Sequence, residues 1–134
     1  MEVPSAKWFA EVADTYNSGD VQAFVARFAP GVVFEPDPRW PEPGPFVGRA
    51  AFARFLEEWS GAWEEPRLEV ERVEQRGGAA IAECRWIVSG ASSGAAVPTA
   101  FTVVARFGPD GQATRIAAFL DRDEALRSVG SGSR

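Results

Sequence analysis

The apolar and polar positions in the first half of the chain follow the period of amphipathic helices. Three helices are predicted, over residues 5–16, 20–28 and 49–59, and Asp20 is placed to cap the second. Between the second and third helices, the run at residues 32–35 is β-branched and aromatic, which predicts a short strand, and a loop rich in proline follows it.

After the third helix the pattern changes to the two-residue alternation of strands. Arg72 interrupts this alternation before Val73, as a β-bulge does. Asp121 can cap a last short helix. An order of two helices, a strand, a helix and four strands joined by hairpins predicts an α+β fold with an antiparallel sheet. The four strands are expected over residues 68–73, 80–88, 97–107 and 113–119.

Length and composition fit one globular domain. The chain has 134 residues, 46% of them hydrophobic and 25% charged. We expect a single domain over residues 1–130 and a disordered or vector-derived tail over residues 131–134. A net charge of −5 argues against nucleic-acid binding, and no apolar run is long enough to span a membrane. With one cysteine and no signal-peptide pattern, a cytoplasmic location is expected.

The chain contains no histidine, so a carboxylate is the natural candidate for acid/base chemistry. Asp37 follows the first predicted strand, where burial at a pocket rim would raise its pKa. The alternative is a solvated turn residue in a Pro-rich loop. Glu35 is the second candidate, although a regular strand points Glu35 and Phe34 to opposite faces, and Phe34 is the expected inward residue.

Two further polar positions lie on the second long strand. Glu83 and Arg85 share one face and form either a pocket-facing ion pair or, as we favour, part of the outer or interface surface. Cys84 lies between them without a histidine partner and is expected to be a buried, unreactive thiol. No metal-ligand spacing and no cofactor motif is present, so no cofactor is expected.

Aromatic residues make up 12% of the chain and include five tryptophans. Trp8 and Trp59 lie on amphipathic helical stripes and are expected in the core. Trp40 lies between prolines in a loop, where it can cover a cavity or stack on a ligand, and Trp63 can act similarly. The only tyrosine, Tyr16, offers either one neutral donor to a pocket or a core ring with its tip at the surface.

Four local runs resemble the SnoaL-like branch of the nuclear transport factor 2-like superfamily, and the resemblance covers nearly the whole chain. They are YNSGDVQAF at residues 16–24, VFEPDP at 33–38, FVGRAAF at 46–52 and FLDRDEAL at 119–126. The resemblance implies a cone-shaped barrel, that is, a strongly curved antiparallel sheet wrapped around three N-terminal helices, with a short C-terminal helix. It also implies a cavity that opens near the Pro-rich loop, cofactor-independent chemistry and a homodimer formed through the outer face of the sheet.

On this resemblance, the expected ligand is a small apolar or cyclic molecule. Thr99, Phe101 and Val103 share the strand face that the resemblance turns toward the cavity. The expected catalytic residues are Asp37 and Glu35. The expected ligand contacts are Tyr16, Phe34, Trp40, Phe55, Trp59, Trp63, Thr99, Phe101, Val103 and Phe119.

Comparison with ketosteroid isomerases, relatives on the same scaffold, argues against their mechanism here. That chemistry needs a carboxylate base and two oxyanion donors, a tyrosine and a protonated aspartate. Val12 and Val103 stand at the two donor positions, and the base position falls at or beside Pro36, one residue before Asp37. Loss of even one such donor costs about 10²–10³ in rate. Mechanisms that resemble the histidine-dependent ones of scytalone dehydratase or the SnoaL cyclase are disfavoured for the same reason.

Two classes of function therefore remain open. The first is a SnoaL-like domain with an aromatic pocket that binds a small hydrophobic molecule, with or without a carboxylate-driven isomerase, cyclase, dehydratase or epoxide-hydrolase reaction. The second is a non-catalytic, dimeric interaction scaffold without a small-molecule ligand.

Overall fold

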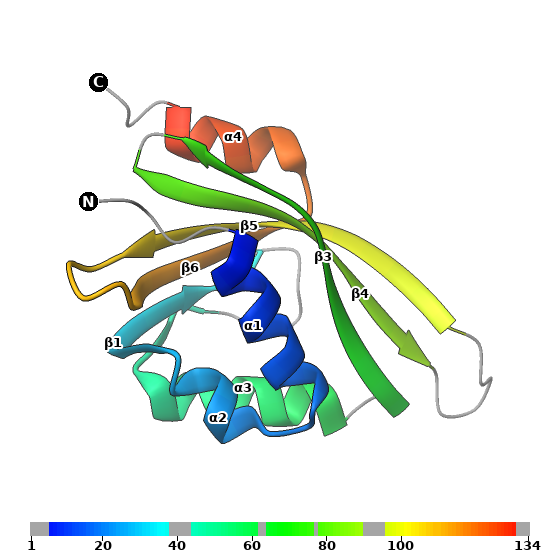
Figure 1. Ribbon diagram of the computed structural model, residues 1–134. Helices are drawn as coiled ribbons and strands as arrows, with labels where there is room; N and C mark the ends of the chain where they lie inside the picture. Colours follow the sequence, from blue (N-terminus) through cyan, green and yellow to red (C-terminus); the bar gives the residue numbers. More distant parts are fainter. Residues whose placement is uncertain (1–5, 38–43, 62–63, 77, 90–95, 131–134) are drawn as a thin grey trace.

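The computed structural model describes residues 6–37, 44–61, 64–76, 78–89 and 96–130 (Figure 1). Two helices come first, a third follows the first two strands, and a fourth follows the last strand. The elements are α1 (Ala6–Asn17), α2 (Val21–Val25), β1 (Phe28–Glu35), β2 (Phe46–Val47), α3 (Arg49–Gly61), β3 (Glu64–Arg76), β4 (Ala79–Ser89), β5 (Ala96–Phe107), β6 (Ala113–Phe119) and α4 (Arg122–Gly130).

The strands form one six-stranded sheet in the order β2-β1-β6-β5-β4-β3. All neighbouring strands are antiparallel except β1 and β6, which are parallel, so the sheet is mixed. The long strands β3, β4 and β5 bend across the molecule, and α1, α2 and α3 lie on the concave side (Figure 1). The predicted α+β fold with a curved sheet around three helices is confirmed.

The term barrel, however, does not fit the described residues. The sheet has two edges, β2 and β3, which are not hydrogen-bonded to each other. Among the described residues, strand β2 pairs only with β1, over two residues, and β3 pairs only with β4, so the ring of strands that a barrel requires is not completed. The expected cone-shaped barrel is therefore an open, strongly curved sheet.

The second helix is shorter than the sequence predicts. Helix α2 ends before Phe28, which already belongs to β1 and pairs with Ala113 of β6. Phe24 and Phe28 are four residues apart, as on one face of a helix, and both are buried in the same core. Phe24 reaches this core from α2, whereas Phe28 reaches it from β1. Pro30 and Gly31 are tolerated inside β1 because the register with β6 shifts in this stretch.

Three local predictions are confirmed. Oδ1 of Asp20 accepts a backbone N–H of α2 at 2.9 Å, and Oδ1 of Asp121 accepts one of α4 at 2.8 Å. The register between β3 and β4 shifts between Val70 and Arg72, which is the predicted bulge.

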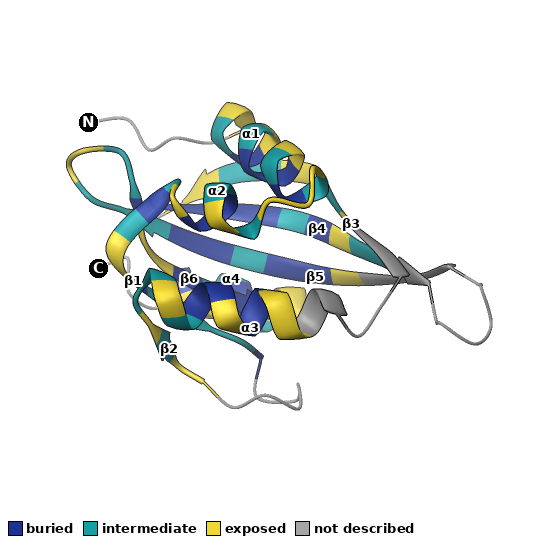
Figure 2. Ribbon diagram, turned by 90° about the horizontal axis from the view of Figure 1, so that it is seen from below, coloured by how far each residue is buried: buried dark blue, intermediate teal, exposed yellow. Residues whose placement is uncertain are grey.

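Two groups of buried side chains lie on opposite faces of the sheet. Along α1 and α3, buried positions alternate with exposed ones (Figure 2). The larger group fills the space between the concave face and α1, α2 and α3, and it is rich in aromatic rings. Trp8 is partly buried against this group, and its ring packs edge-on against Phe28 and Phe107, with centroid distances of 5.4 and 5.0 Å, as expected for a tryptophan on the apolar stripe of α1. The smaller group joins α4 to the other face and comprises Ala79, Ile81, Val104, Ala125 and Val129.

Candidate functional site

Asp37 lies just beyond the end of β1 and is only 1% exposed. Its Oδ2 accepts a hydrogen bond from the backbone N–H of Leu120, directly after β6, at 2.7 Å. A buried carboxylate is costly unless hydrogen bonds compensate for the lost water, and this amide supplies one of them. Asp37 is therefore a buried, oriented carboxylate and not a solvated turn residue.

Glu35 has different surroundings. Its neighbour Phe34 is buried in the core, as predicted, whereas the Glu35 side chain remains 41% exposed. Arg115 of the adjacent strand β6 forms an ion pair with Glu35, with 2.8 Å between Nη2 and Oε1. The structure thus places the two predicted carboxylates in unlike environments, and only Asp37 is withdrawn from water.

Phe34 and Phe55 belong to one aromatic group on the inner side of β1. The Phe34 ring stacks on Phe52 of α3 at 4.8 Å and contacts Phe55 at 5.0 Å. Phe46 of β2 contacts Phe55 at 5.0 Å. Two residues that were predicted as ligand contacts therefore form one wall made by β1 and α3.

A second aromatic group joins α1 to the inner face of β4 and β5. Tyr16 is buried, and its ring centroid lies 5.1 Å from that of Trp86 and 5.6 Å from that of Phe24. Trp86 in turn lies 6.3 Å from Phe101. Val103, two residues along β5 from Phe101, is partly buried against the same core. Tyr16, Phe101 and Val103 are thus brought to the same side of the sheet.

Trp86 was not predicted as a site residue. The signal was present, because Ala80, Ala82, Cys84 and Trp86 alternate along β4 and share its inner face. The first three side chains are small and the fourth is the largest of all.

Phe119 lies on the other side of the sheet. Ile116 and Ala118 of β6 belong to the larger core, whereas Phe119 packs against the group beneath α4. Alternation along β6 therefore turns Phe119 away from Phe101 and Val103.

Four of the expected ligand contacts cannot be placed. Trp40 and Trp63 lie outside the described residues. Trp59 and Thr99 belong to α3 and β5, but their side chains are not among those described. The predicted tail at 131–134 also lies outside the described range.

Cys84 is buried and free, as predicted. Burial raises the pKa of its thiol to about 12, and the nearby carboxylates of Glu71 and Glu83 add to the rise. At neutral pH the thiolate is therefore negligible and the thiol is unreactive.

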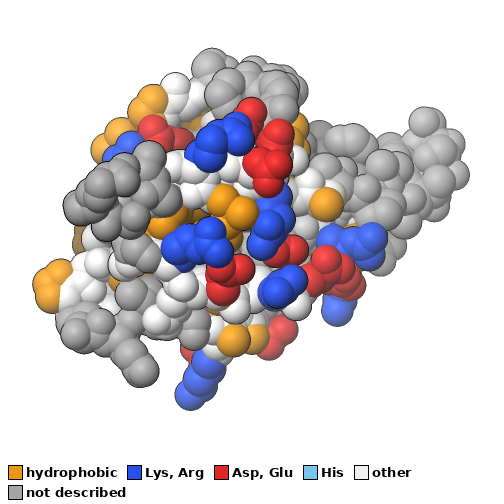
Figure 3. All heavy atoms as spheres, turned by 90° about the horizontal axis from the view of Figure 1, so that it is seen from above, with side chains coloured by type: hydrophobic (Ala, Val, Ile, Leu, Met, Phe, Trp, Pro, Cys, Tyr) orange, Lys and Arg blue, Asp and Glu red, His pale blue; other side chains and the backbone are white. Residues whose placement is uncertain are grey.

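The outer face of β3 and β4 carries side chains of both charges. Glu83 binds Arg122 of α4, with 2.7 Å between Oε2 and Nε, whereas Arg85 pairs with Glu71 of β3 at 3.3 Å. Figure 3 shows basic and acidic side chains interspersed on the side of the molecule opposite α1–α3. Glu83 and Arg85 are thus surface residues with separate partners, which confirms the favoured interpretation.

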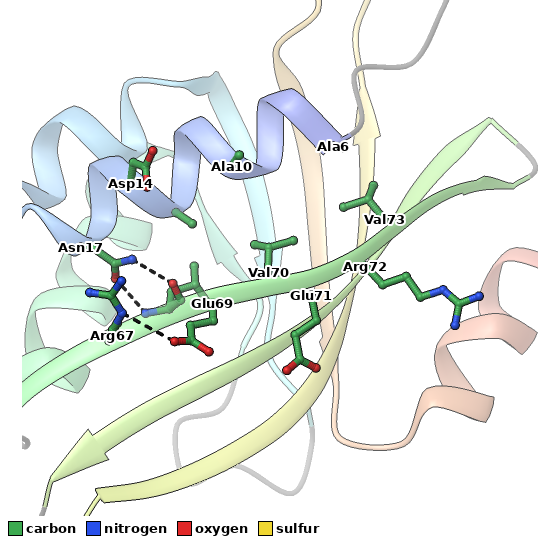
Figure 4. Close-up of a pocket in the computed structure, with 12 residues that line it drawn as sticks. Ala6, Ala10, Asp14, Asn17, Arg67, Glu69, Val70, Glu71, Arg72 and Val73 are labelled. Atoms are coloured by element: carbon green, nitrogen blue, oxygen red, sulfur yellow. Dashed lines mark hydrogen bonds and ion pairs between the residues drawn. The ribbon is translucent and has the colours of Figure 1, made fainter.

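A groove of about 530 Å³ lies between α1 and the edge strand β3. Figure 4 shows Val70 and Val73 pointing from β3 toward the helix, where Ala6 and Ala10 leave space. Asn17 pairs with the backbone of Leu68 at this groove: Nδ2 donates to the carbonyl at 2.9 Å, and Oδ1 accepts from the N–H at 2.8 Å. The side-chain amide replaces a neighbouring strand at that position.

The features around this groove protect an edge strand. The Asn17 amide, the bulge after Val70 and the charged residues Arg67 and Glu69, whose Nε and Oε2 lie 3.7 Å apart, all disfavour pairing with a further strand. The role of Asn17 was missed because its partner is 51 residues away in sequence.

Neither a metal site nor a membrane-spanning helix is found in the part of the chain that the structure describes. No group of three or more Cys, Asp or Glu residues there is arranged to hold a metal ion. No described helix has the length and apolar character needed to cross a bilayer.

A curved sheet folded over three helices, with an aromatic inner face, is the architecture of the nuclear transport factor 2-like class of proteins. The model of the SnoaL-like domain family matches residues 9–116. The chain therefore belongs to the SnoaL-like family, and the resemblance noted from its sequence runs is confirmed. No curated protein matches the chain.

Solved structures share this architecture. A nuclear transport factor 2-like protein of unknown function from Burkholderia pseudomallei is 19% identical, with a TM-score of 0.73 over 92% of this chain and 95% of its own. Another is SalBIII, an epoxide hydrolase/cyclase-like enzyme with a role in pyran ring formation in the polyether salinomycin. It is 20% identical, with a TM-score of 0.69 over 84% of this chain and 87% of its own.

A third structure contains a bound ligand. It is a Mycobacterium tuberculosis protein in complex with estradiol-17β-hemisuccinate, 15% identical, with a TM-score of 0.72 over 87% of this chain and 92% of its own. Similarity at this level establishes the fold, and activity must be argued from the residues of this chain.

Proposed function

We propose that this SnoaL-like domain binds a small apolar or cyclic molecule between the inner face of the sheet and helices α1 and α3. The observation that carries the proposal is the buried carboxylate of Asp37, which follows Phe34 and its aromatic wall by three residues. A buried charge in a small domain costs folding free energy, so its retention favours a role in binding or chemistry. The steroid-derivative complex and the cyclase-like enzyme support the view that this fold accommodates cyclic molecules.

The chemistry that we propose is a cofactor-independent acid/base conversion. As a carboxylate, Asp37 would accept a proton from a carbon next to a carbonyl, or from a water that attacks an epoxide, and would return the proton to the product. Isomerase, cyclase, dehydratase and epoxide-hydrolase reactions share this step. Glu35, in its surface ion pair with Arg115, is the weaker of the two expected catalytic carboxylates.

The experiment replaces Asp37 by asparagine, which keeps the shape of the side chain and removes its charge. Binding and turnover are measured with cyclic ketones and epoxides of one to three rings. We expect turnover to fall by at least about 10²-fold, the lower range for loss of a positioned acid/base group. The matched control is Glu58→Gln, at an exposed carboxylate of α3, which should leave turnover unchanged. Unchanged turnover in a folded Asp37→Asn protein would remove Asp37 from the mechanism.

The second candidate is a dimeric scaffold without a small-molecule ligand. The observation that favours it is the outer face of the sheet, where Arg85 and Glu71 form an ion pair while remaining about half exposed (45% and 51%). Such a face could pair with a second copy in the cytoplasm, where we expect the protein to reside. Light scattering of a folded dimer that binds none of the cyclic probes would favour this candidate over ligand binding.

A further inference from the structure

Pro36 follows β1 directly, and Gly44 lies two residues before β2. In the antiparallel pairing of these strands Phe34 faces Phe46, and continuing this register by two residues places Gly44 opposite Pro36. The two residues are in close contact there. They meet at the base of the Pro-rich segment, next to Asp37.

Gly44 has no room for a side chain. A methyl group at this position would lie 2.5 Å from Cδ and 3.2 Å from Cγ of Pro36, and 3.6 Å from the carbonyl oxygen of Phe34. Carbon atoms in van der Waals contact are about 3.5–4.0 Å apart, so the first of these distances requires a displacement of about 1 Å. The proline ring is fused to the backbone and cannot turn aside as the end of a flexible side chain can. Only glycine therefore fits opposite Pro36 without a shift of the backbone.

The backbone that would shift carries Asp37, the residue after Pro36. Strand β1 lies between β2 and β6 in the sheet, so this stretch has a neighbour on each side. On the side of β6, the N–H of Leu120 donates to Oδ2 of Asp37 at 2.7 Å. On the side of β2, the contact with Gly44 limits where Pro36 can lie. A displacement of Pro36 away from Gly44 would thus move Asp37 relative to the amide that binds it.

We propose that Gly44 is a positioning residue, whose missing side chain lets Pro36 hold Asp37 where its carboxylate receives this hydrogen bond. The inference rests on the proposed function, because it assigns Gly44 to the acid/base role of Asp37. A carboxylate that transfers a proton must lie within hydrogen-bond reach of the reacting group, and a misplacement of about 1 Å can cost about 10²-fold in rate. The contact between Gly44 and Pro36 thus sets the geometry of the proposed catalytic group.

The first test measures the position of the carboxylate without any ligand. The chain has four leucines, so labelling only the leucine nitrogens gives four backbone signals in a nitrogen–proton NMR spectrum, and the one missing in Leu120→Met belongs to Leu120. A short hydrogen bond to a carboxylate moves an amide proton downfield. Gly44→Ala should therefore move the Leu120 signal upfield. The matched control is Gly31→Ala, which should leave the signal in place, because a methyl group at Gly31 has no atom within 4 Å beyond its chain neighbours.

The second test shows whether the effect passes through Pro36. Pro36→Ala removes the two ring atoms, Cγ and Cδ, that a methyl group at Gly44 would approach. In the Pro36→Ala protein, Gly44→Ala should therefore leave the Leu120 signal unchanged, since the effects of residues in contact are not additive. Pro36→Ala alone introduces no clash, so it tests the contact even if Gly44→Ala alone fails to fold. Loss of the ring should speed hydrogen exchange of the Leu120 amide, and unchanged exchange would contradict the proposal.

The third test is turnover of the cyclic ketones and epoxides. Gly44→Ala should lower kcat by about 10²-fold and change KM by less than about 2-fold, because it moves the carboxylate and leaves the aromatic wall intact. In the Pro36→Ala protein the same substitution should change kcat by less than about 2-fold. An unmoved Leu120 signal in folded Gly44→Ala, or a moved signal with unchanged kcat, would overturn this inference alone. Absence of turnover in wild type would overturn the proposed acid/base chemistry and the inference with it.

Discussion

At the scale of single residues, polar groups in this protein are held by partners far away in sequence. Asp37 receives its hydrogen bond from Leu120, 83 residues later, and Asn17 pairs with Leu68, 51 residues later. Sequence patterns identified Asp37 as a carboxylate at the end of a strand, but its burial depends on the parallel pairing of β1 with β6. The element on which such a residue lies can be predicted from the neighbouring sequence, whereas its burial and its hydrogen-bond partners cannot.

Asn17→Ala should destabilise the fold. The change removes both hydrogen bonds to Leu68 and exposes the edge of β3, so we expect a loss of about 1–2 kcal/mol in the free energy of unfolding. Urea denaturation followed by circular dichroism measures the loss. Asn17→Asp, which keeps the acceptor Oδ1 but lacks the amide donor, should fall between wild type and alanine. Equal stability of wild type and Asn17→Ala would show that the paired amide contributes nothing.

Cys84 predicts a change of stability with pH. Because burial raises the thiol pKa from 9.0 to about 12, the folded state holds its proton where the unfolded state releases it. The stabilising contribution is complete below about pH 9 and decreases as the pH rises toward 12, by up to about 1.4 kcal/mol per pH unit.

The measurement is the free energy of unfolding of wild type and Cys84→Ala across that pH range. Subtracting the two curves removes the tyrosine, lysine and arginine titrations that both proteins share. The advantage of wild type should shrink between pH 9 and pH 12. A constant difference would contradict the raised pKa.

At the scale of elements, helix caps, the bulge and the hairpin strands were predictable from local sequence patterns, whereas the boundary between α2 and β1 was not. Caps, the bulge in β3 and the hairpin strands β4, β5 and β6 follow from adjacent residues, and each was predicted closely. The end of α2 and the start of β1 were not, because Phe28 continues a helical spacing while pairing with Ala113. The two-residue strand β2 also escaped prediction, since it is defined only by its pairing with β1.

The inner and outer faces of the strands show the same distinction. Alternation correctly assigns Phe34 to the interior and Glu35 to the surface. For β6, alternation alone allows either face to point inward, and the structure chooses Ile116 and Ala118, which leaves Phe119 beneath α4. A strand with apolar residues on both faces cannot be oriented from its own sequence.

Helix α4 should be held mainly by apolar contacts. Ile81 of β4 is buried at 1% exposure beneath Ala125 and Val129, so Ile81→Ala should cost about 2–5 kcal/mol. Ile87 lies further along the same outer face and is only partly buried, so Ile87→Ala is the matched control and should cost less. Hydrogen exchange should show faster exchange of the α4 amides in Ile81→Ala. Equal effects of the two variants would mean that α4 is not anchored at Ile81.

At the scale of the whole molecule, the family fixes the architecture and leaves the chemistry to individual side chains. The three relatives described share this fold at 15% to 20% identity, yet one is a cyclase-like enzyme and another was solved with a steroid derivative. On the resemblance drawn from the sequence, Val12 and Val103 are expected at the donor positions of the ketosteroid isomerase mechanism, and the chain contains no histidine. The specific features of its interior are a buried aspartate, one tyrosine and an indole on β4.

The most direct test is a crystal structure of the protein with a bicyclic ketone bound. We predict that the ketone lies on the inner face of the sheet, with its rings against Phe55 and Trp86 and its reacting carbon facing Asp37. Binding only in the groove between α1 and β3, or on the outer face, would contradict the proposed site.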